Sequence, residues 1–320
     1  MKLYLLFALF VGALAIHAQS VSTRTMALTF DDLPFAVPGD DQAPGKLADV
    51  QRANARILKI LAAHHATAIG FVNEIKLNVD NERDARAALL RQWLGAGMDL
   101  GNHTYSHPAL SEIETAKYED DFVRGTVITS AEMKTAGKAE RYFRYPFLDT
   151  GKDKAQKQTI IAFYTSRGFV NAPVTVQNQD WLFNVPYSEA VSKHDAAEQK
   201  RIADAYLRHT SDALAYAEVL SKHSFGRQIP QTMLLHLDQL NADQLDAVLS
   251  LFEERGYKFV SADEALRDPA YATADDYVGP EGLTWLERWQ IAMGKPVESD
   301  EPKPPKWARD AYRRITGQEP

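Results

Sequence analysis

Short apolar runs alternate with amphipathic segments along most of this 320-residue chain. The first run, residues 26–30, is apolar apart from one threonine, which is typical of a strand buried on both faces. Residues 49–65 then place apolar side chains three and four positions apart, as on one face of a helix. Further strands are expected at 66–72, 98–100, 141–144, 168–172, 179–183, 232–237 and 257–260. Because strand and helix alternate about seven times, the pattern predicts a parallel α/β architecture.

The remaining helices are expected at 83–94, 114–134, 154–166, 188–223 and 242–255, with a short helix opening at Ser261. Asn241 is the expected N-cap of the helix at 242–255, and the length of 188–223 suggests two helices. Beyond about residue 270 the alternation ends. We expect Trp285 and Trp289 to dock this tail on the domain, and its Pro-rich part at 296–306 to be extended.

The N-terminus has the features of a secretory signal peptide. Lys2 precedes an apolar run that is too short for a membrane span, and small residues follow it. We expect cleavage after Ala15 or Ala18, no membrane anchor on the mature chain, and a periplasmic or secreted location. The expected organisation is a signal peptide at 1–18, a main domain at 19–270 with a helical insertion near 188–223, and a C-terminal tail at 271–320.

Composition narrows the chemistry of any site. The chain has no cysteine, so disulfides and thiolate metal sites are excluded, and a transition-metal site must use histidine and carboxylate. Its formal net charge of −7, without basic clusters, argues against nucleic acid or an anionic membrane as a partner. A neutral or cationic polymer is compatible with this charge.

Two adjacent carboxylates, Asp31 and Asp32, follow the first apolar run directly. Catalytic groups in α/β folds gather at the carboxyl ends of strands, because the loops there converge on one crevice. Neighbouring carboxylates repel each other, and a metal ion on one with a proton on the other would separate their roles. The alternative for such a pair is a solvated loop or a helix N-cap.

His103 and His107 follow the strand expected at 98–100. Since Pro108 disfavours helix at His107, we expect a tight turn that lets the two imidazoles converge. The alternative is two ordinary surface or core histidines. With Asp32 as a third ligand the set suits Zn²⁺ with one position open, and Co²⁺ or another divalent transition metal fits as well.

Polar residues also end later apolar runs. Arg144 would orient Asp31 and keep it ionised, unless it is an ordinary surface cation. His236 follows three apolar residues and is a candidate general acid, although a lone histidine there is otherwise a core residue. Asp180 would supply that histidine with a carboxylate partner, and Trp181 would give the pocket an aromatic wall.

These residues fall into five short motifs: Thr-Phe-Asp-Asp at 29–32, His-Thr-Tyr-Ser-His at 103–107, Arg-Tyr-Pro-Phe at 144–147, Asp-Trp at 180–181 and Leu-Leu-His at 234–236. In order and spacing the series resembles the motifs of polysaccharide deacetylases of the NodB-homology type, carbohydrate esterase family 4. The resemblance covers about residues 25–266. It implies a distorted (β/α) barrel of about seven parallel strands. It also implies a metal-dependent hydrolase that deacetylates an N-acetylated polysaccharide or oligosaccharide, of the peptidoglycan or chitin type.

The resemblance implies catalytic roles for four residues. Asp31 would be the catalytic base, and Arg144 would hold it. His236 would be the acid that protonates the leaving amine, and Asp180 would tune that acid.

It also implies a metal site and a substrate pocket. Three residues would bind Zn²⁺: Asp32, His103 and His107. Trp181 and Leu234 would line the acetyl pocket, and Thr104 would brace the histidine turn. The backbone N–H of Phe147 would help to bind the oxyanion.

The chain departs from the family pattern in three places. Leu33-Pro34 and a long loop at 33–46 stand where the family usually has Gly-Pro, and Arg-Tyr-Pro-Phe replaces Arg-Pro-Pro-Tyr. The helical stretch at 188–223 is longer than expected. Both enlarged connections would border and deepen the cleft, unless 188–223 packs on the outer wall of the barrel.

Three other functions stay open at this point. An O-acetyl esterase of the acetylxylan type would use the same site, since esters and amides share a tetrahedral intermediate. A metal-independent amidohydrolase could use the same fold. A non-catalytic carbohydrate-binding protein is the alternative outside the enzymes.

Overall fold

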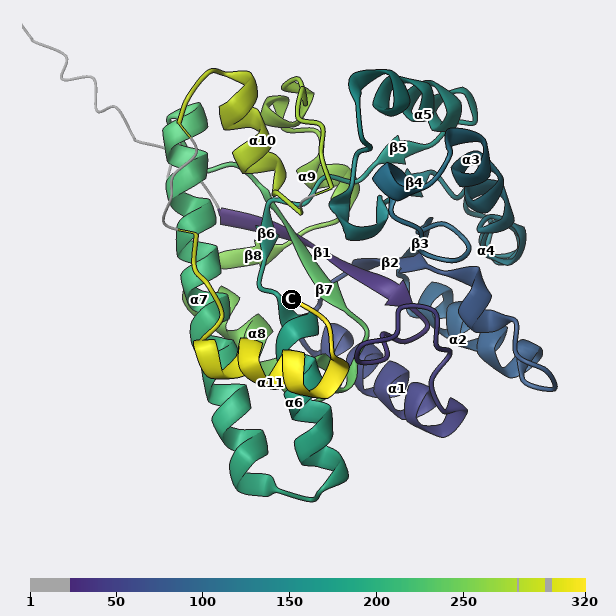
Figure 1. The fold of residues 1–320 in the computed structure, drawn as a ribbon, viewed down its shortest axis with the longest axis vertical. Coiled ribbons are helices and arrows are strands. Elements are labelled where there is room, and N and C mark those ends of the chain that lie inside the picture. The colour runs from purple at the N-terminus through teal and green to yellow at the C-terminus, as the bar shows by residue number, and fades with distance from the viewer. Residues whose placement is uncertain (1–23, 281, 297–300) are drawn as a thin grey trace, which may run out of the picture.

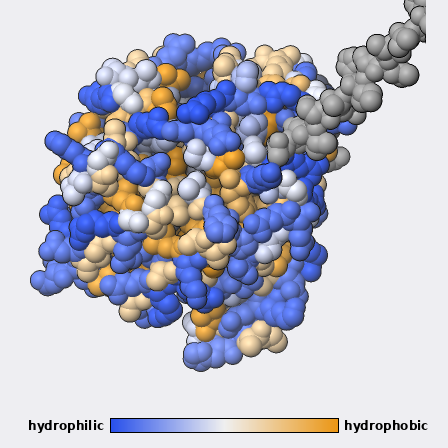
Figure 2. Space-filling view, turned by 180° about the vertical axis from the view of Figure 1, so that it is seen from behind, coloured by the Kyte–Doolittle hydropathy of each residue, from blue (hydrophilic) through white to orange (hydrophobic). Residues whose placement is uncertain are grey.

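The computed structural model describes residues 24–280, 282–296 and 301–320. The expected signal peptide lies outside the described residues, as does part of the segment expected to be extended at 296–306. Within the described ranges, none of the helices has the length and apolar character that a membrane span requires. On the face shown in Figure 2, hydrophilic side chains predominate and apolar ones are interspersed among them.

Eight parallel strands form the central sheet of the described chain (Figure 1). They are β1 Arg24–Leu33, β2 Ala68–Val72, β3 Asp99–Asn102, β4 Tyr142–Phe143, β5 Val170–Asn171, β6 Val176–Gln177, β7 Gln231–His236 and β8 Tyr257–Phe259. Seven follow the order β5-β4-β3-β2-β1-β7-β6, and β8 pairs with the start of β1. In the part of the chain that the structure describes, β5 and β6 end this order and are not paired with each other. The barrel is therefore open between them, which confirms the predicted distorted (β/α) barrel of about seven strands.

Strand β1 lies in the interior of the sheet, between β2 and β7. Its residues from Met26 onwards are all buried, because neighbouring strands cover its edges and other parts of the fold cover both of its faces. A strand covered on both faces needs a continuous apolar run rather than alternation. This is why its sequence predicted it so clearly.

Helices surround the sheet (Figure 1). They are α1 Leu47–Ala63, α2 Arg83–Gly95, α3 Thr115–Arg124, α4 Val127–Thr135, α5 Lys154–Ser166, α6 Asp180–Ser192, α7 Ala196–Phe225, α8 Gln239–Glu254, α9 Ala262–Ala265, α10 Trp285–Ala292 and α11 Lys306–Thr316. Short 3₁₀ turns lie at Glu74–Leu77, Leu110–Glu112, Pro146–Leu148 and Pro269–Ala272.

Several local predictions were wrong. The expected strand at 179–183 is the start of α6, and the expected helix at 114–134 is divided into α3 and α4 around Gly125. At Gly125 a Cβ atom would lie 2.6 Å from the backbone of Thr104, so only glycine permits this approach. The N-cap of α8 is Asp238 rather than Asn241, since its side chain accepts a hydrogen bond from the Asn241 N–H at 2.7 Å.

The C-terminal tail packs on the domain, as its two tryptophans predicted. Trp285 and Trp289 are buried in the main apolar core. The ring of Trp289 contacts Phe225 and Tyr271 edge to face, at centroid distances of 5.6 and 5.4 Å. Helix α11 was not predicted from the sequence, and it packs across α6.

Candidate active site

Asp31 and Asp32 lie near the carboxyl end of β1 and are 2% and 4% exposed. Successive side chains of a regular strand point to opposite faces. Here the backbone breaks the alternation, because Asp32 has a φ of 67° and the register with β2 shifts between Phe30 and Leu33. Both carboxylates consequently line the same cavity.

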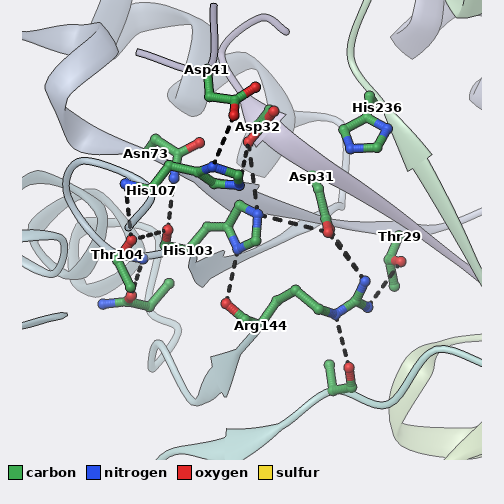
Figure 3. A network of polar contacts seen from close by, with 12 residues as sticks. Thr29, Asp31, Asp32, Asp41, Asn73, His103, Thr104, His107, Arg144 and His236 are labelled. Carbon is green, nitrogen blue, oxygen red and sulfur yellow. Dashed lines mark hydrogen bonds and ion pairs between the residues drawn. The ribbon is translucent and has the colours of Figure 1, made fainter. Parts of the chain in front are cut away.

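Asp32, His103 and His107 form a group that could hold a metal ion (Figure 3). One ligand atom from each lies within 4.8 Å of the others. Asp32 Oδ1 is 3.7 Å from His103 Nε2 and 3.4 Å from His107 Nε2. The same oxygen is buried and has no hydrogen-bond partner among the described residues. A buried oxygen that lacks a hydrogen bond and faces two imidazoles fits a cation.

The two histidines stand on a tight turn, as predicted from Pro108. Thr104 and His107 both have left-handed backbone conformations, with φ of 64° and 59°. Thr104 Oγ1 donates to the His103 carbonyl at 2.5 Å and accepts from the His107 N–H at 3.2 Å. The carboxylate of Asp121 accepts both intervening backbone N–H groups at 2.9 Å. Thr104 therefore braces the turn in the predicted way.

The protonation of His103 also suits metal binding. Its Nδ1 lies 2.8 Å from the carbonyl oxygen of Arg144, which can only accept, so Nδ1 carries the proton. The lone pair of Nε2 is then directed toward Asp32. Burial lowers the pKa of His103 well below its ordinary value, which keeps the ring neutral.

Arg144 holds Asp31 inside the barrel. Its Nη1 lies 3.3 Å from each carboxylate oxygen of Asp31. The rest of the guanidinium is fixed as well, since Nε donates to the Ala172 carbonyl at 2.8 Å and Nη2 donates to Thr29 Oγ1 at 3.1 Å. The orientation predicted for this arginine is therefore observed, and Thr29 is a partner that the sequence did not suggest.

His236 and Asp180 form the second ion pair of the site. His236 is the register partner of Asp31 on β7, and it lies on the side of Asp31 away from His107 (Figure 3). Asp180 Oδ1 is 2.7 Å from His236 Nδ1, and Asp180 Oδ2 accepts the His236 backbone N–H at 2.7 Å. The side-chain amide of Asn241 donates to Oδ2 at 2.6 Å. Asp180 stands in the first turn of α6, where a carboxylate is favoured by the helix dipole.

The two adjacent carboxylates have pKa values shifted in opposite directions. Burial raises the pKa of Asp31, and the nearby Arg144 only partly opposes that. Burial also acts to raise the pKa of Asp32, but Lys76 and the histidines outweigh it and the net pKa is lowered. Arg144 therefore orients Asp31 and acts against the effect of burial on its pKa, the direction expected of a partner that favours the ionised form. A base of raised pKa beside a strongly ionised ligand matches two separate roles.

The cavity has a volume of about 550 Å³. Phe147, Trp181 and Leu234, predicted to contact substrate, all line it. Phe147 is 48% exposed, and its ring lies 4.4 Å from that of His107. Its φ of 56° and that of Leu148, 54°, show a sharp turn at this point of the wall.

The two enlarged connections differ in position. From the loop at 33–46, residues 36–39 and Asp41 line the cavity, so this loop borders the site as expected. No residue of 188–223 lines it within the described structure. Helix α7 instead packs against α6, α8 and α10, so the outer-wall alternative is the correct one.

Lys76 is a residue of the site that sequence reasoning missed. It is fully buried, and its Nζ lies 3.7 Å from Asp32 Oδ1 and 3.5 Å from the Asp32 carbonyl. The only local signal is a lysine between two apolar residues in the turn Glu74–Leu77. A buried cation beside a metal-type carboxylate bears on how tightly that carboxylate binds an ion.

The tail also supports the loop that carries Phe147. Arg288 Nη2 donates to the carbonyl of Leu148 at 2.5 Å. The N–H of Thr150 donates to the Gly279 carbonyl at 3.3 Å. This segment lies outside the five motifs, yet it fixes one wall of the cavity.

Comparison with known proteins agrees with this geometry. Residues 18–163 match the family model for polysaccharide deacetylase. A curated chitooligosaccharide deacetylase of Bradyrhizobium sp. (strain ANU 289) is 26% identical over 161 residues, which cover 50% of this chain and 59% of that protein. The match thus spans little more than half the length of the curated relative.

Two solved structures of a pseudoenzyme of carbohydrate esterase family 4 show the same fold. The wild-type protein, from Bacillus anthracis, has a TM-score of 0.50 and 17% identity, with coverage of 77% of this chain and 66% of that one. A mutant described as having restored enzymatic activity has a TM-score of 0.51 and 18% identity, with coverage of 77% and 68%. With its five motifs at the strand ends of this fold, the chain is similar to the polysaccharide deacetylases of the NodB-homology type, carbohydrate esterase family 4.

Proposed function

We propose that this protein is a metal-dependent hydrolase that removes acetyl groups from an N-acetylated polysaccharide or oligosaccharide of the chitin or peptidoglycan type. The observation that carries the proposal is one cavity in which a three-residue metal-type group lies beside a held carboxylate and a histidine–aspartate pair. The name of the curated relative, a chitooligosaccharide deacetylase, supports an acetamido sugar as substrate. The sequence features of residues 1–18 support action in the periplasm or outside the cell.

Zn²⁺ is the proposed metal, with Asp32, His103 and His107 as its ligands. The neutral His103, the ionised Asp32 and its Oδ1 atom, which accepts no hydrogen bond within the described structure, fit such an ion, and Co²⁺ fits the same donors. When bound, the ion supplies Lewis-acid polarisation of the acetyl carbonyl.

The remaining chemistry belongs to side chains of the chain itself. Asp31 accepts the proton of the attacking water, and its raised pKa favours that role. Arg144 fixes the direction of the Asp31 carboxylate. His236, protonated through its contact with Asp180, gives its proton to the leaving amine. The backbone N–H of Phe147 is the proposed hydrogen-bond donor to the oxyanion that develops on the acetyl carbonyl oxygen.

Acetate release tests this proposal. Metal-loaded protein is incubated with chitin oligomers, peptidoglycan, acetylxylan and small acetyl esters, and Asp31→Asn serves as the inactive control. Release from the acetamido sugars, lost in the control, is the expected result. Release from acetylxylan alone would assign an O-acetyl esterase instead. Binding of sugar without release from any substrate would assign the non-catalytic function, which is relevant because a pseudoenzyme has the same fold.

A further inference from the structure

The C-terminal segment forms part of the wall of the active-site cavity, although the five motifs end far before it. Four of its residues line the cavity: Glu301, Tyr312, Gln318 and Glu319. We call residues 301–319 the C-terminal wall. Its helix α11 lies across α6 (Figure 1).

On one side the C-terminal wall is attached to α6, the helix that begins with Asp180. The rings of Tyr312 and Trp181 meet edge to face at 5.3 Å. Arg314 forms a two-pronged ion pair with Glu189, with nitrogen–oxygen distances of 3.1 and 2.7 Å. The wall is therefore bound to the element that carries both the partner of His236 and the aromatic side chain of the acetyl pocket.

On the other side the wall contacts the loop at 33–46. Thr316 packs against Gly39, so closely that a Cβ atom at Gly39 would lie 2.9 Å from Thr316 Cγ2. Asp41 of the same loop acts on the pKa of Tyr312, which burial raises in the first place. Helix α11 thus connects both sides of the cavity, the loop after β1 and the start of α6.

This connection adds a wall to the cavity. A polysaccharide bound by an internal residue needs room for sugars on both sides of the reacting acetamide. Here Tyr312 of α11, with Gln318 and Glu319 after the helix, occupies part of the cavity wall. The remaining space, about 550 Å³, is within the range of about 300–1,000 Å³ for small-molecule sites.

We propose that the C-terminal wall determines substrate length: the enzyme deacetylates short acetamido oligosaccharides and sugars at chain ends, and it excludes internal residues of long polymers. Tyr312 is the specificity-determining residue, because its ring is the part of α11 that meets both the cavity and Trp181. Gln318 and Glu319 offer polar atoms for the hydroxyls of the terminal sugar. The inference rests on the proposed deacetylase function and deepens it.

The test compares kcat/KM for the N-acetylglucosamine dimer through hexamer and for a long soluble chitin derivative. For wild type we expect values that stop rising after the shortest oligomers and fall for the polymer. Tyr312→Ala should raise the ratio of kcat/KM on the polymer to kcat/KM on a small acetyl ester by about tenfold, the scale of one removed contact. Lys306→Ala, on an exposed position of the same helix, is the matched control and should behave as wild type.

A second variant covers the case in which Tyr312→Ala does not fold, a point that thermal unfolding decides. Gly39→Cys with Thr316→Cys places two cysteines at a Cβ separation near 3.4 Å in a chain that has none. If the wall is a fixed barrier, the oxidised variant keeps the wild-type preference for short substrates. Loss of all activity on oxidation, restored by reductant, would show that the wall must move and would overturn the proposal.

The failure of the inference is distinct from the failure of the proposed function. No acetate from any substrate, the small ester included, would refute the function. Acetate release that increases steadily with chain length in wild type, or that Tyr312→Ala leaves unchanged, would refute the wall alone.

Discussion

Replacement of Asp180 by asparagine is the sharpest test of the proposed acid. Asp180 accepts hydrogen bonds from the ring and the backbone of His236 and from Asn241, and it is fully buried. Asparagine keeps the size and one acceptor oxygen but removes the charge. The change therefore separates the electrostatic effect of Asp180 from its packing.

The expected magnitude follows from the pKa of His236. Burial alone would lower that pKa, but the charge of Asp180 and its hydrogen bond raise it from 6.5 to about 10. Without the carboxylate the pKa should fall to the ordinary value or below. At pH 8 a histidine of ordinary pKa is about 3% protonated, so kcat/KM on an amide substrate should fall about 30-fold. Below pH 6 the loss should be small, because the ring is protonated in both proteins.

The assay is kcat/KM of metal-loaded enzyme as a function of pH, on an acetamido sugar and on an activated acetyl ester. The protonated ring is the active form, so the wild-type profile has its limb on the alkaline side, and Asp180→Asn should move this limb toward acid. The ester should respond less, since its leaving group needs no proton. A bound cation lowers the pKa of His236 in the wild type and in Asp180→Asn alike. The quantity compared is therefore the difference between the two pKa values.

The same pair makes stability depend on pH. Because the folded-state pKa of His236 is raised, its contribution to the free energy of unfolding is full below pH 6.5 and is lost as pH rises through about 10. Asp180→Asn should remove this dependence. It should also cost about 1–3 kcal/mol, since the new amide cannot accept all four hydrogen bonds, which come from the His236 ring, the His236 and Trp181 backbones, and Asn241.

Asn241→Ala is the matched control, because it removes one neutral hydrogen bond to Asp180 and keeps the charge. It should lower stability and leave the alkaline limb in place. If Asp180→Asn lost activity equally at all pH values and on both substrates, Asp180 would be a packing residue. Its proposed effect on the pKa of His236 would then be refuted.

Three further outcomes are expected. Asp31→Asn should keep bound metal and lose about 10²–10⁴ in kcat, whereas Asp32→Asn should lose the metal in elemental analysis; equal metal loss would mean that the roles are wrongly divided. Lys76→Met removes a cation that lies 3.7 Å from Asp32 Oδ1, and the interaction between these two charges is worth about 4 kcal/mol at an effective dielectric constant of about 20. The affinity for zinc, measured by calorimetry, should therefore rise at least about tenfold. An unchanged affinity would contradict a role of Lys76 in weakening metal binding. Arg144→Met leaves Asp31 buried without its partner and should lower the free energy of unfolding, measured with denaturant, by about 3–5 kcal/mol. Adding Asp31→Asn should recover part of this loss. No recovery would show that lost packing, and not the unpaired charge, causes the loss.

The sequence alone predicted the broad architecture and the polar residues that meet in the cavity. Continuous apolar runs such as that of β1 indicate a strand buried on both faces. Polar residues directly after such runs indicate the carboxyl edge of a parallel sheet. The spacing of His103 and His107 before Pro108 was enough to predict a tight turn. Arg144, Asp180 and His236 meet the carboxylates because each lies at or just beyond the end of one of the parallel strands.

The tertiary structure decided what the local pattern does not encode. The left-handed backbone conformation of Asp32 directs two neighbouring carboxylates toward the same cavity. It accompanies a register shift between strands, which the Asp-Asp dipeptide does not predict. Lys76 looks like any lysine until the fold buries it against Asp32. The division of the helix at 114–134 results from the close approach of Gly125 to a backbone that lies earlier in the chain.

The shape of the site was decided in the same way. The stretch at 188–223 and the C-terminal segment are both helical additions, and only packing placed one outside the barrel and the other on the cavity. Helix α11 reaches the site through Trp181, Glu189 and Gly39, residues far from it in the sequence. The polar residues of the site can be found from the spacing of the motifs, because each motif lies at the end of a strand and the strands fix the order of the motifs. The walls around those groups depend on contacts between distant segments, which leave no period or spacing in the sequence.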